Sequence, residues 1–147
     1  MAPKAAVGAA DAKKLLEKAA EARKMAYAPY SKFRVGAALL FENGETVCGC
    51  NVENASYGLS ICAERSAMAA AVIKGLTKPL ALAVAGGGGT SCPPCGACRQ
   101  FLAEFNPHMS VILEDGGEPK IYPLKELLPF SFSLDDARGG AHDGCGK

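Results

Sequence analysis

Apolar side chains recur at helical spacing in the first part of the chain. We predict a helix over residues 12–28, with Asp11 as its N-cap and Pro29 as its end, because an aspartate satisfies free N–H groups and a proline cannot continue a helix. The residues of its single apolar face are Ala12, Leu15, Leu16, Ala19, Ala22 and Ala26.

Two further segments also have helical character. Residues 61–74 are apolar nearly all round, which predicts a central buried helix with Ser60 as its N-cap and Gly75 as its C-terminal stop. A shorter helix is predicted over residues 95–105, where Pro94 suits the first helical position.

Strand patterns occupy most of the remaining chain. Residues 32–41 and 45–51 flank Asn43-Gly44, a strong signal for a β-hairpin. Residues 80–85 are continuously apolar, which is typical of a strand that is covered on both faces.

A second hairpin is predicted near the end of the pattern. The strands at 110–114 and 120–122 are separated by so few residues that a parallel crossover is impossible, so they should be antiparallel. A helical turn over 124–128 follows. The order of elements predicts a three-layer α/β/α fold, in which a mixed five-stranded sheet carries helices on both faces.

Length and charge narrow the class of protein. The 147 residues suit one domain over 1–136, followed by a Gly-rich tail over 137–147 that we expect to be flexible. The formal net charge of +1 gives no long-range attraction to phosphates, so we expect no nucleic-acid partner. No apolar run approaches the ~18 residues of a membrane span. Residues 1–10 do not resemble a secretory signal, which favours a cytoplasmic location.

Seven cysteines are a high count for a chain expected in a reducing compartment, which favours metal binding or catalysis over disulfides. Cys62 falls at the start of one predicted helix, and Cys95 and Cys98 lie in the first turn of the next, three residues apart on one face. Helix N-termini favour thiolates. Three thiolates can hold zinc with its fourth position open, as in catalytic zinc sites.

Two charged residues follow Cys62. Glu64 is placed poorly for a ligand, but its length suits a general base that reaches a water at the metal. Arg65 could hydrogen-bond a ligand sulfur and offset the negative charge of three thiolates.

These residues resemble the signature of the zinc-dependent nucleoside deaminases, in which the zinc ligands are either one histidine and two cysteines or three cysteines. The chain resembles the small homotetrameric cytidine deaminase family from about Tyr30 to Asp136. The matching motifs are Cys62-Ala63-Glu64-Arg65, Pro94-Cys95-Gly96-Ala97-Cys98-Arg99-Gln100, Tyr30-Ser31-Lys32-Phe33, Val35-Gly36-Ala37-Ala38-Leu39, Gly49-Cys50-Asn51-Val52-Glu53-Asn54 and Leu127-Leu128-Pro129.

The resemblance implies zinc-dependent hydrolysis of cytidine and 2′-deoxycytidine to the uridines and ammonia, as in pyrimidine salvage, with one zinc on Cys62, Cys95 and Cys98. Glu64 would carry the protons. The resemblance also implies a homotetramer with shared active sites. The implied substrate contacts are Phe33 against the base, Asn51 and Glu53 on the ribose 3′-hydroxyl, the backbone of Ala55 and Ala63 on the base, and Tyr57 and Phe132 at a neighbouring subunit's site. Phe130 stands where a small residue is common in the family.

Other interpretations remain open for single residues. Cys92, Cys95 and Cys98 also read as part of an iron–sulfur motif, although its usual fourth cysteine is missing. A Cys-x-x-Cys pair alone is more often structural zinc. Asn51 and Glu53 could form a turn network and Phe33 a core contact, while Cys48 and Cys50 are expected to pack.

Three alternative functions are also open. A deaminase of another aminopyrimidine, such as blasticidin S, would share the zinc motifs. A polynucleotide-editing deaminase usually has a crossover helix before a parallel last strand, for which Asp115-Gly116-Gly117 leaves no room. A non-catalytic zinc-binding module would bind metal without turnover.

Overall fold

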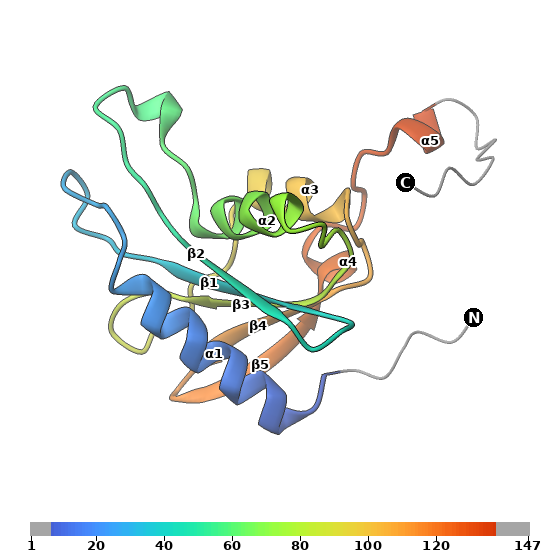
Figure 1. Ribbon diagram of the computed structural model, residues 1–147, viewed down its shortest axis with the longest axis horizontal. Coiled ribbons are helices and arrows are strands. Elements are labelled where there is room, and N and C mark those ends of the chain that lie inside the picture. The colour runs from blue at the N-terminus through green and yellow to red at the C-terminus, as the bar shows by residue number, and fades with distance from the viewer. Residues whose placement is uncertain (1–6, 138–147) are drawn as a thin grey trace.

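A five-stranded mixed sheet forms the centre of the molecule, in the order β2-β1-β3-β4-β5 (Figure 1). The computed structural model describes residues 7–137. β3 and β4 are parallel, and every other neighbouring pair is antiparallel, which confirms the mixed sheet and the antiparallel last hairpin. The strands are β1 (Gly36–Phe41), β2 (Thr46–Cys50), β3 (Pro79–Ala85), β4 (Ser110–Asp115) and β5 (Glu118–Pro123).

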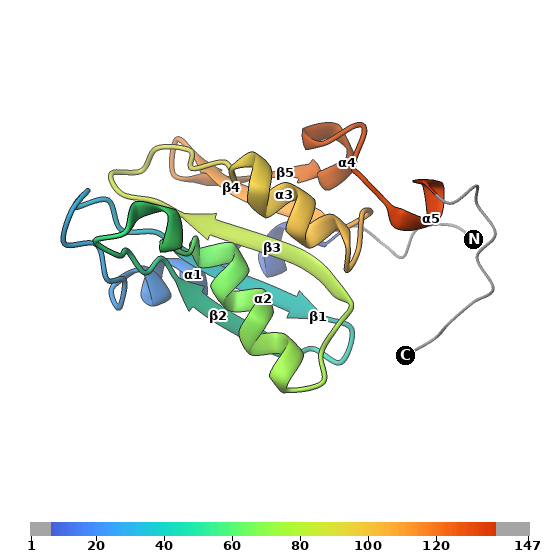
Figure 2. The same cartoon turned by 90° about the horizontal axis from the view of Figure 1, so that it is seen from above.

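Helices cover both faces of this sheet, so the expected three-layer α/β/α fold is confirmed (Figures 1 and 2). The helix α1 (Ala9–Arg23) lies on one face, and α2 (Ala63–Ile73) and α3 (Gly96–Ala103) lie side by side on the other. The remaining short elements are the 3₁₀ turn η1 (Tyr57–Leu59), α4 (Leu124–Leu127) and α5 (Leu134–Ala137).

The central strand β3 is buried on both faces, as its continuous apolar run predicted. Its alternate residues Ala81, Ala83 and Ala85 pack with α1, whereas Leu82 and Val84 pack in the larger core beneath α2 and α3. The small side chains allow α1 to lie close to the sheet.

Two glycines bring helices against the sheet more closely than any side chain would permit. A Cβ atom at Gly36 would lie 1.9 Å from the Ala19 carbonyl oxygen of α1, and one at Gly49 would lie 2.4 Å from the Ala67 backbone nitrogen of α2. Both contacts involve backbone atoms, which cannot swing aside. Gly49 therefore sets the distance between β2 and α2, whose N-cap is Cys62.

The first helix differs from its prediction at both ends. Its N-cap is Gly8 rather than Asp11, and it ends at Arg23 rather than at residue 28. The chain leaves the helix because Tyr27 pairs with the strand-like segment after β2: its N–H donates to the Asn51 carbonyl at 3.0 Å, and its carbonyl accepts from Glu53 N–H at 2.8 Å. A long-range backbone pairing thus overrides the helical pattern of 24–28.

The predicted boundaries of the second helix were also wrong at its start. Ile61 exchanges both backbone hydrogen bonds with Val52, at 3.0 and 2.9 Å, so the helix cannot begin before Cys62, which is its N-cap in place of Ser60. Gly75, with φ of 78°, ends the helix as predicted. Burial all round was wrong for the last turn, because Ile73 is 88% exposed.

Smaller differences concern the third helix and the ends of the chain. Cys95 is the N-cap of α3, so Pro94 precedes the helix instead of occupying its first position. Within residues 7–137, no helix combines the length and apolar character needed to cross a membrane. The expected flexible tail lies, beyond Ala137, outside the described residues.

Candidate active site

The N-terminal ends of α2 and α3 bring three cysteines together. Cys62 and Cys95 are the N-caps of the two helices, and Cys98 lies in the first turn of α3. Their sulfur atoms all lie within 4.8 Å of one another, and the Cys62 and Cys95 sulfurs are 3.9 Å apart. Residues separated by more than 30 positions in the sequence therefore form one cluster.

The geometry of this cluster fits zinc. Four ligands at about 2.3 Å in a tetrahedron place neighbouring sulfurs about 3.8 Å apart, close to the distance between Cys62 and Cys95. Cys62, Cys95 and Cys98 form the one metal-ligand group found among the described residues, and Cys92 is not part of it. The donor set is therefore three thiols, which suits zinc with one open position better than an iron–sulfur fragment.

The thiols have opposed electrostatic environments. Burial raises the pKa of Cys98 strongly, and the negative charges of Glu64 and Cys62 raise it further. Partial burial alone would raise the pKa of Cys95, but hydrogen bonds from the Cys98 backbone N–H and from neighbouring thiols lower it. Three adjacent thiolates repel one another, so a bound cation is what allows all three to be ionised together.

Glu64 is a buried carboxyl next to these sulfurs. It lies in the first turn of α2 with 4% of its surface exposed, and among residues 7–135, whose burial is described, it is the one charged residue in the buried class. It stands two residues after Cys62, at the end of α2 that carries the cysteine cluster, and its charge adds to the effect of burial in raising the pKa of Cys98. Burial of a carboxyl group is costly to a fold, so this placement favours a chemical role.

Arg65 places positive charge beside the same cluster. Its Nη2 atom donates to the Cys62 sulfur at 3.5 Å, and this hydrogen bond raises the pKa of Arg65. Its Nε–H is buried without a hydrogen-bond partner in the described part of the chain. The guanidinium is thus committed to the sulfur side of the site, where it offsets thiolate charge.

An aromatic ring and a further thiol border the site. Phe33 is half exposed, so it is not a core residue. A Cβ atom on Gly86 would lie 3.2 Å from the Cys92 sulfur and 3.4 Å from the Phe33 ring, which places these three residues together. Burial, then the charges of Glu64 and Cys62, raises the pKa of Cys92. Phe33 and Cys92 therefore lie next to each other at Gly86.

Asn51 and Glu53 hold the loop that carries Phe33. The Asn51 side chain donates to the Phe33 carbonyl at 2.9 Å and accepts from Val35 N–H at 2.8 Å. Glu53 Oε1 accepts from the Tyr30 and Ser31 backbone N–H groups at 3.0 and 3.1 Å. The pKa of Glu53 is lowered most by a hydrogen bond from the Ser31 side chain and next by one from the Ser31 backbone N–H. The turn network considered from sequence is present here.

Glu53 also faces a cavity of about 310 Å³. Tyr57, on η1, lines it and meets Tyr30 edge-on, with ring centroids 6.0 Å apart. Tyr30, Ser31 and Ser60 were not among the expected site residues, although the first two belong to a motif that was noted in the sequence. The residues that line this cavity are Tyr30, Ser31, Glu53, Tyr57 and Ser60.

The other expected substrate contacts are scattered within one chain. Ala63 is fully buried beside Glu64, and Ala55 lies exposed in the loop before η1. Phe132 lines a different cavity, of about 520 Å³, between the end of α3 and the start of α5. A single chain therefore does not bring Phe132 to the cavity beside Glu53 and Tyr57.

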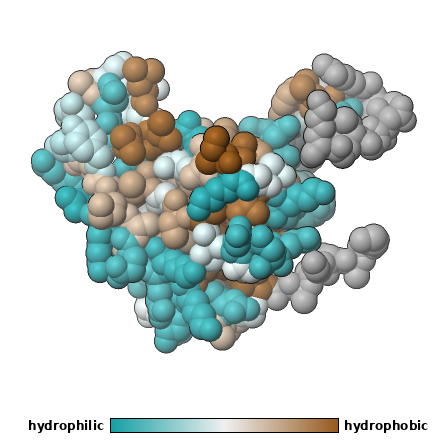
Figure 3. Space-filling model, in the orientation of Figure 1, coloured by the Kyte–Doolittle hydropathy of each residue, from teal (hydrophilic) through white to brown (hydrophobic). Residues whose placement is uncertain are grey.

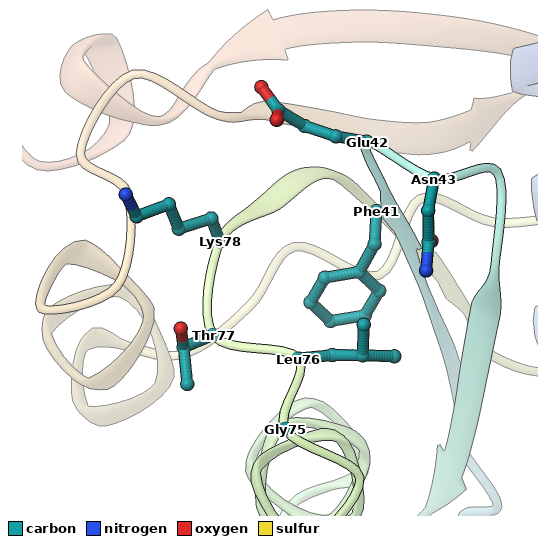
Figure 4. Close-up of a pocket in the computed structure, with 7 residues that line it drawn as sticks. All are labelled: Phe41, Glu42, Asn43, Gly75, Leu76, Thr77 and Lys78. Carbon is teal, nitrogen blue, oxygen red and sulfur yellow. The ribbon is translucent and has the colours of Figure 1, made fainter. Parts of the chain in front are cut away.

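A further hollow of about 230 Å³ lies at the other end of α2, beyond Gly75 (Figure 4). The Phe41 ring and the Leu76 side chain lie close together there, and Lys78 stands at the edge. It contains none of the cysteines and is separate from the site.

Comparison with known proteins agrees with this geometry. The profile of the cytidine and deoxycytidylate deaminase zinc-binding region matches residues 9–114. A cytidine deaminase of Halalkalibacterium halodurans is 43% identical over 128 residues, which cover 86% of this chain and 97% of that protein. A cytidine deaminase of Mycobacterium tuberculosis is 45% identical over 118 residues, 80% of this chain and 86% of that protein.

Solved structures give the same result. The crystal structure of cytidine deaminase from Burkholderia pseudomallei has a TM-score of 0.77 and 45% identity, and the match covers 82% of this chain and 98% of that one. That of the Mycobacterium tuberculosis enzyme has a TM-score of 0.75 and 43% identity, with 84% and 98% covered. This chain belongs to the cytidine and deoxycytidylate deaminase family.

Proposed function

We propose that this family member hydrolyses cytidine and 2′-deoxycytidine to uridine and 2′-deoxyuridine, with release of ammonia. One observation carries the proposal: three cysteine sulfurs converge within 4.8 Å beside Glu64, a buried carboxyl. This combination provides a metal site and a proton carrier at one point, which a structural zinc site does not need.

Cys62, Cys95 and Cys98 would hold the zinc. When bound, zinc supplies Lewis acidity that makes water a nucleophile near neutral pH. The Glu64 carboxylate would take a proton from the attacking water and deliver it to N3 of the pyrimidine, which makes C4 more electrophilic as the water oxygen bonds to it. It would then move the proton of the new C4 hydroxyl to the amino group, so that the C4–N bond breaks, ammonia leaves and the C4 carbonyl of the uridine forms. Arg65 stabilises the negative charge that the sulfurs retain.

The residues around the cluster are suited to a nucleoside. Phe33 offers an exposed aromatic face for the base, with backbone groups at Ala55 and Ala63 as its hydrogen-bonding partners. The Glu53 carboxylate borders the cavity beside Tyr57, where it can accept a hydrogen bond from the ribose 3′-hydroxyl. Asn51 acts with Glu53 by holding the loop through Phe33 and Val35.

We further propose a homotetramer in which chains share active sites. The η1 segment and α5 project on the same side of the sheet as α2 and α3 (Figure 1), and hydrophobic patches interrupt the polar surface seen in Figure 3. Large apolar side chains exposed along this side suit burial against further copies. They are Tyr57, Leu59, Ile61, Val72, Ile73, Phe101, Phe130, Phe132 and Leu134.

A cytoplasmic location is part of the proposal. The six cysteines within the described residues are all free thiols, which is the usual state in a reducing compartment.

A spectrophotometric assay tests the proposed reaction. The purified zinc-loaded protein is mixed separately with cytidine, 2′-deoxycytidine, cytidine monophosphate and blasticidin S, and loss of each aminopyrimidine absorbance is followed. We expect turnover of both nucleosides. Turnover of blasticidin S alone would move the enzyme to the other aminopyrimidine class. No turnover in a protein that retains zinc would indicate a non-catalytic zinc module.

A polynucleotide substrate is not proposed. The last strand β5 runs antiparallel to β4 and follows it after a two-residue turn, so the crossover helix usual in polynucleotide editors is absent. The net charge of +1 also gives no long-range attraction to a phosphate backbone.

A further inference from the structure

The segment around Phe132 has little apolar packing of its own. Between α4 and α5 the chain has no regular secondary structure, and its two aromatic side chains, Phe130 and Phe132, are 97% and 62% exposed. Burial therefore does not fix the position of Phe132. Some other interaction must hold an aromatic residue that, under the proposed function, completes a nucleoside pocket.

Gln100 of α3 provides that interaction. Its Nε2 donates to the Phe132 carbonyl at 2.9 Å, and its Oε1 accepts from the Phe132 N–H at 2.9 Å. The amide thus forms the same pair of bonds that two facing residues exchange in an antiparallel sheet. The Gln100 amide therefore satisfies both the N–H and the carbonyl of Phe132.

The neighbouring residue on α3 ties down two more segments. Arg99 donates from Nε to the Pro94 carbonyl and from Nη1 to the Leu127 carbonyl, both at 2.7 Å. Pro94 precedes the metal-ligand residue Cys95, and Leu127 ends α4. Cys98, Arg99 and Gln100 are consecutive, so one turn of helix links the metal cluster to the C-terminal segment.

We infer that Gln100 is a positioning residue for substrate binding, which sets Phe132 in register with the helix that carries Cys95 and Cys98. This inference rests on the proposed function and its shared active sites, in which Phe132 contacts the nucleoside in a neighbouring copy's pocket. Gln100 itself touches no reacting atom. Its role is to fix the backbone of Phe132 to α3, so that one chain presents the aromatic side chain to the neighbouring copy's pocket from a rigid element.

Chemically, the position requires an amide of this length. Methionine has a similar length but can make neither bond, whereas ionised glutamate keeps an acceptor for the Phe132 N–H and turns a second acceptor towards the Phe132 carbonyl. Ser133 provides a matched control in the same segment, because its hydroxyl accepts from Asp135 N–H at 3.2 Å, a hydrogen bond within that segment.

The test compares Gln100→Met, Gln100→Glu and Ser133→Ala with the wild type, with and without Phe132→Ala. We expect each Gln100 variant to raise KM for cytidine about 5- to 30-fold, the range for loss of one or two hydrogen bonds of ordinary net strength. The value of kcat should change less than about threefold, because positioning outside the reacting atoms weakens binding more than chemistry. Zinc content and the KM of Ser133→Ala should match the wild type.

Two further measurements make the result specific. When Gln100→Met is added to Phe132→Ala, KM should rise by less than about twofold over that of Phe132→Ala alone. The effects of two residues do not add when one acts through the other. Hydrogen exchange at the Phe132 amide should accelerate in Gln100→Met and stay unchanged in Ser133→Ala. Additive losses, unchanged KM in both Gln100 variants, or loss of zinc with Gln100→Met would each overturn the inference. A wild type inactive on cytidine would instead refute the proposed function, and the inference with it.

Discussion

Glu64 is the residue whose environment is least explained by folding alone. It is 4% exposed, and its charge adds to the effect of burial in raising the pKa values of the nearby Cys98 and Cys92 thiols. Because charge at a buried position destabilises a fold unless it is compensated, a carboxylate held there indicates chemistry. Its proposed task, to move protons between water, N3 and the leaving amine, requires a group that can be protonated and deprotonated.

Glu64→Gln keeps the size of the side chain and removes that capacity. We expect kcat for cytidine to fall by at least ~100-fold, which is typical of lost general acid–base catalysis. Zinc content by elemental analysis should stay at the wild-type level, because Glu64 is not among the three ligand residues. Near-normal turnover by this variant would show that another group carries the protons.

The same elemental analysis distinguishes the cysteines that bind zinc from Cys92. Cys62→Ala, Cys95→Ala and Cys98→Ala should each lose zinc and activity, because two remaining thiolates bind the ion poorly. Cys92→Ala should retain both, since Cys92 lies beside Gly86 and outside the cluster. If Cys92 proved necessary for metal and Cys62 did not, the iron–sulfur or structural-zinc interpretation would replace this one.

At the scale of the element, the closeness of α2 to β2 determines where the site lies. Cys62 and Glu64 are at the start of α2, and Gly49 allows the middle of that helix to approach the strand. A methyl group at position 49 would lie 2.4 Å from the Ala67 nitrogen and 2.7 Å from the Ala63 carbonyl oxygen. Such contacts can be relieved only by displacing the helix.

Gly49→Ala should therefore destabilise the protein by about 1 to 3 kcal/mol, the usual cost of overpacking a well-packed interior, and reduce zinc affinity as the helix start moves. Chemical denaturation and a competitive zinc titration measure the two effects. Gly58→Ala is the matched control, because a Cβ there would meet no atom within 4 Å. Equal stability of both variants would show that α2 shifts without cost.

At the scale of the whole molecule, one chain leaves its candidate substrate contacts apart. Glu53 and Tyr57 line one cavity, while Phe132 lines another beyond α3. Either Phe132 has no part in the pocket, or it completes the pocket of a neighbouring copy. The exposed apolar side chains near α2, α3 and η1 favour assembly.

Coexpression of differently tagged chains distinguishes these possibilities. Phe132→Ala should weaken substrate binding by about 1 to 3 kcal/mol, by analogy with base–aromatic stacking. Coexpressed with Glu64→Gln chains, it should regain activity per Phe132→Ala chain, because mixed oligomers contain sites with an intact Glu64 from one copy and Phe132 from another. The control coexpresses Phe132→Ala chains with chains that carry both Glu64→Gln and Phe132→Ala. The activity per Phe132→Ala chain should not rise there, because no chain supplies an intact Phe132. A fully active monomer by light scattering would refute shared sites.

Much of the fold follows from local pattern. The hairpin at Asn43-Gly44, the buried run of β3 and the helix stop at Gly75 each depend on neighbours in sequence, through turn geometry, covered strand faces and positive φ. The antiparallel end of the sheet was equally determined, because a short link cannot form a parallel crossover. The spacing and motifs of the cysteines also predicted the cluster of Cys62, Cys95 and Cys98.

Only the tertiary structure decided which distant backbones meet. Pairing of Tyr27 and Ile61 with the segment after β2 ended one helix early and delayed the start of the next. The link between Gln100 and Phe132, and the use of Asn51 to hold the Phe33 loop, depend on the same kind of contact. Periodicity records which face of an element is apolar. It carries no information on which remote N–H and C=O groups a side chain will bind, because those partners become neighbours only when the chain has folded.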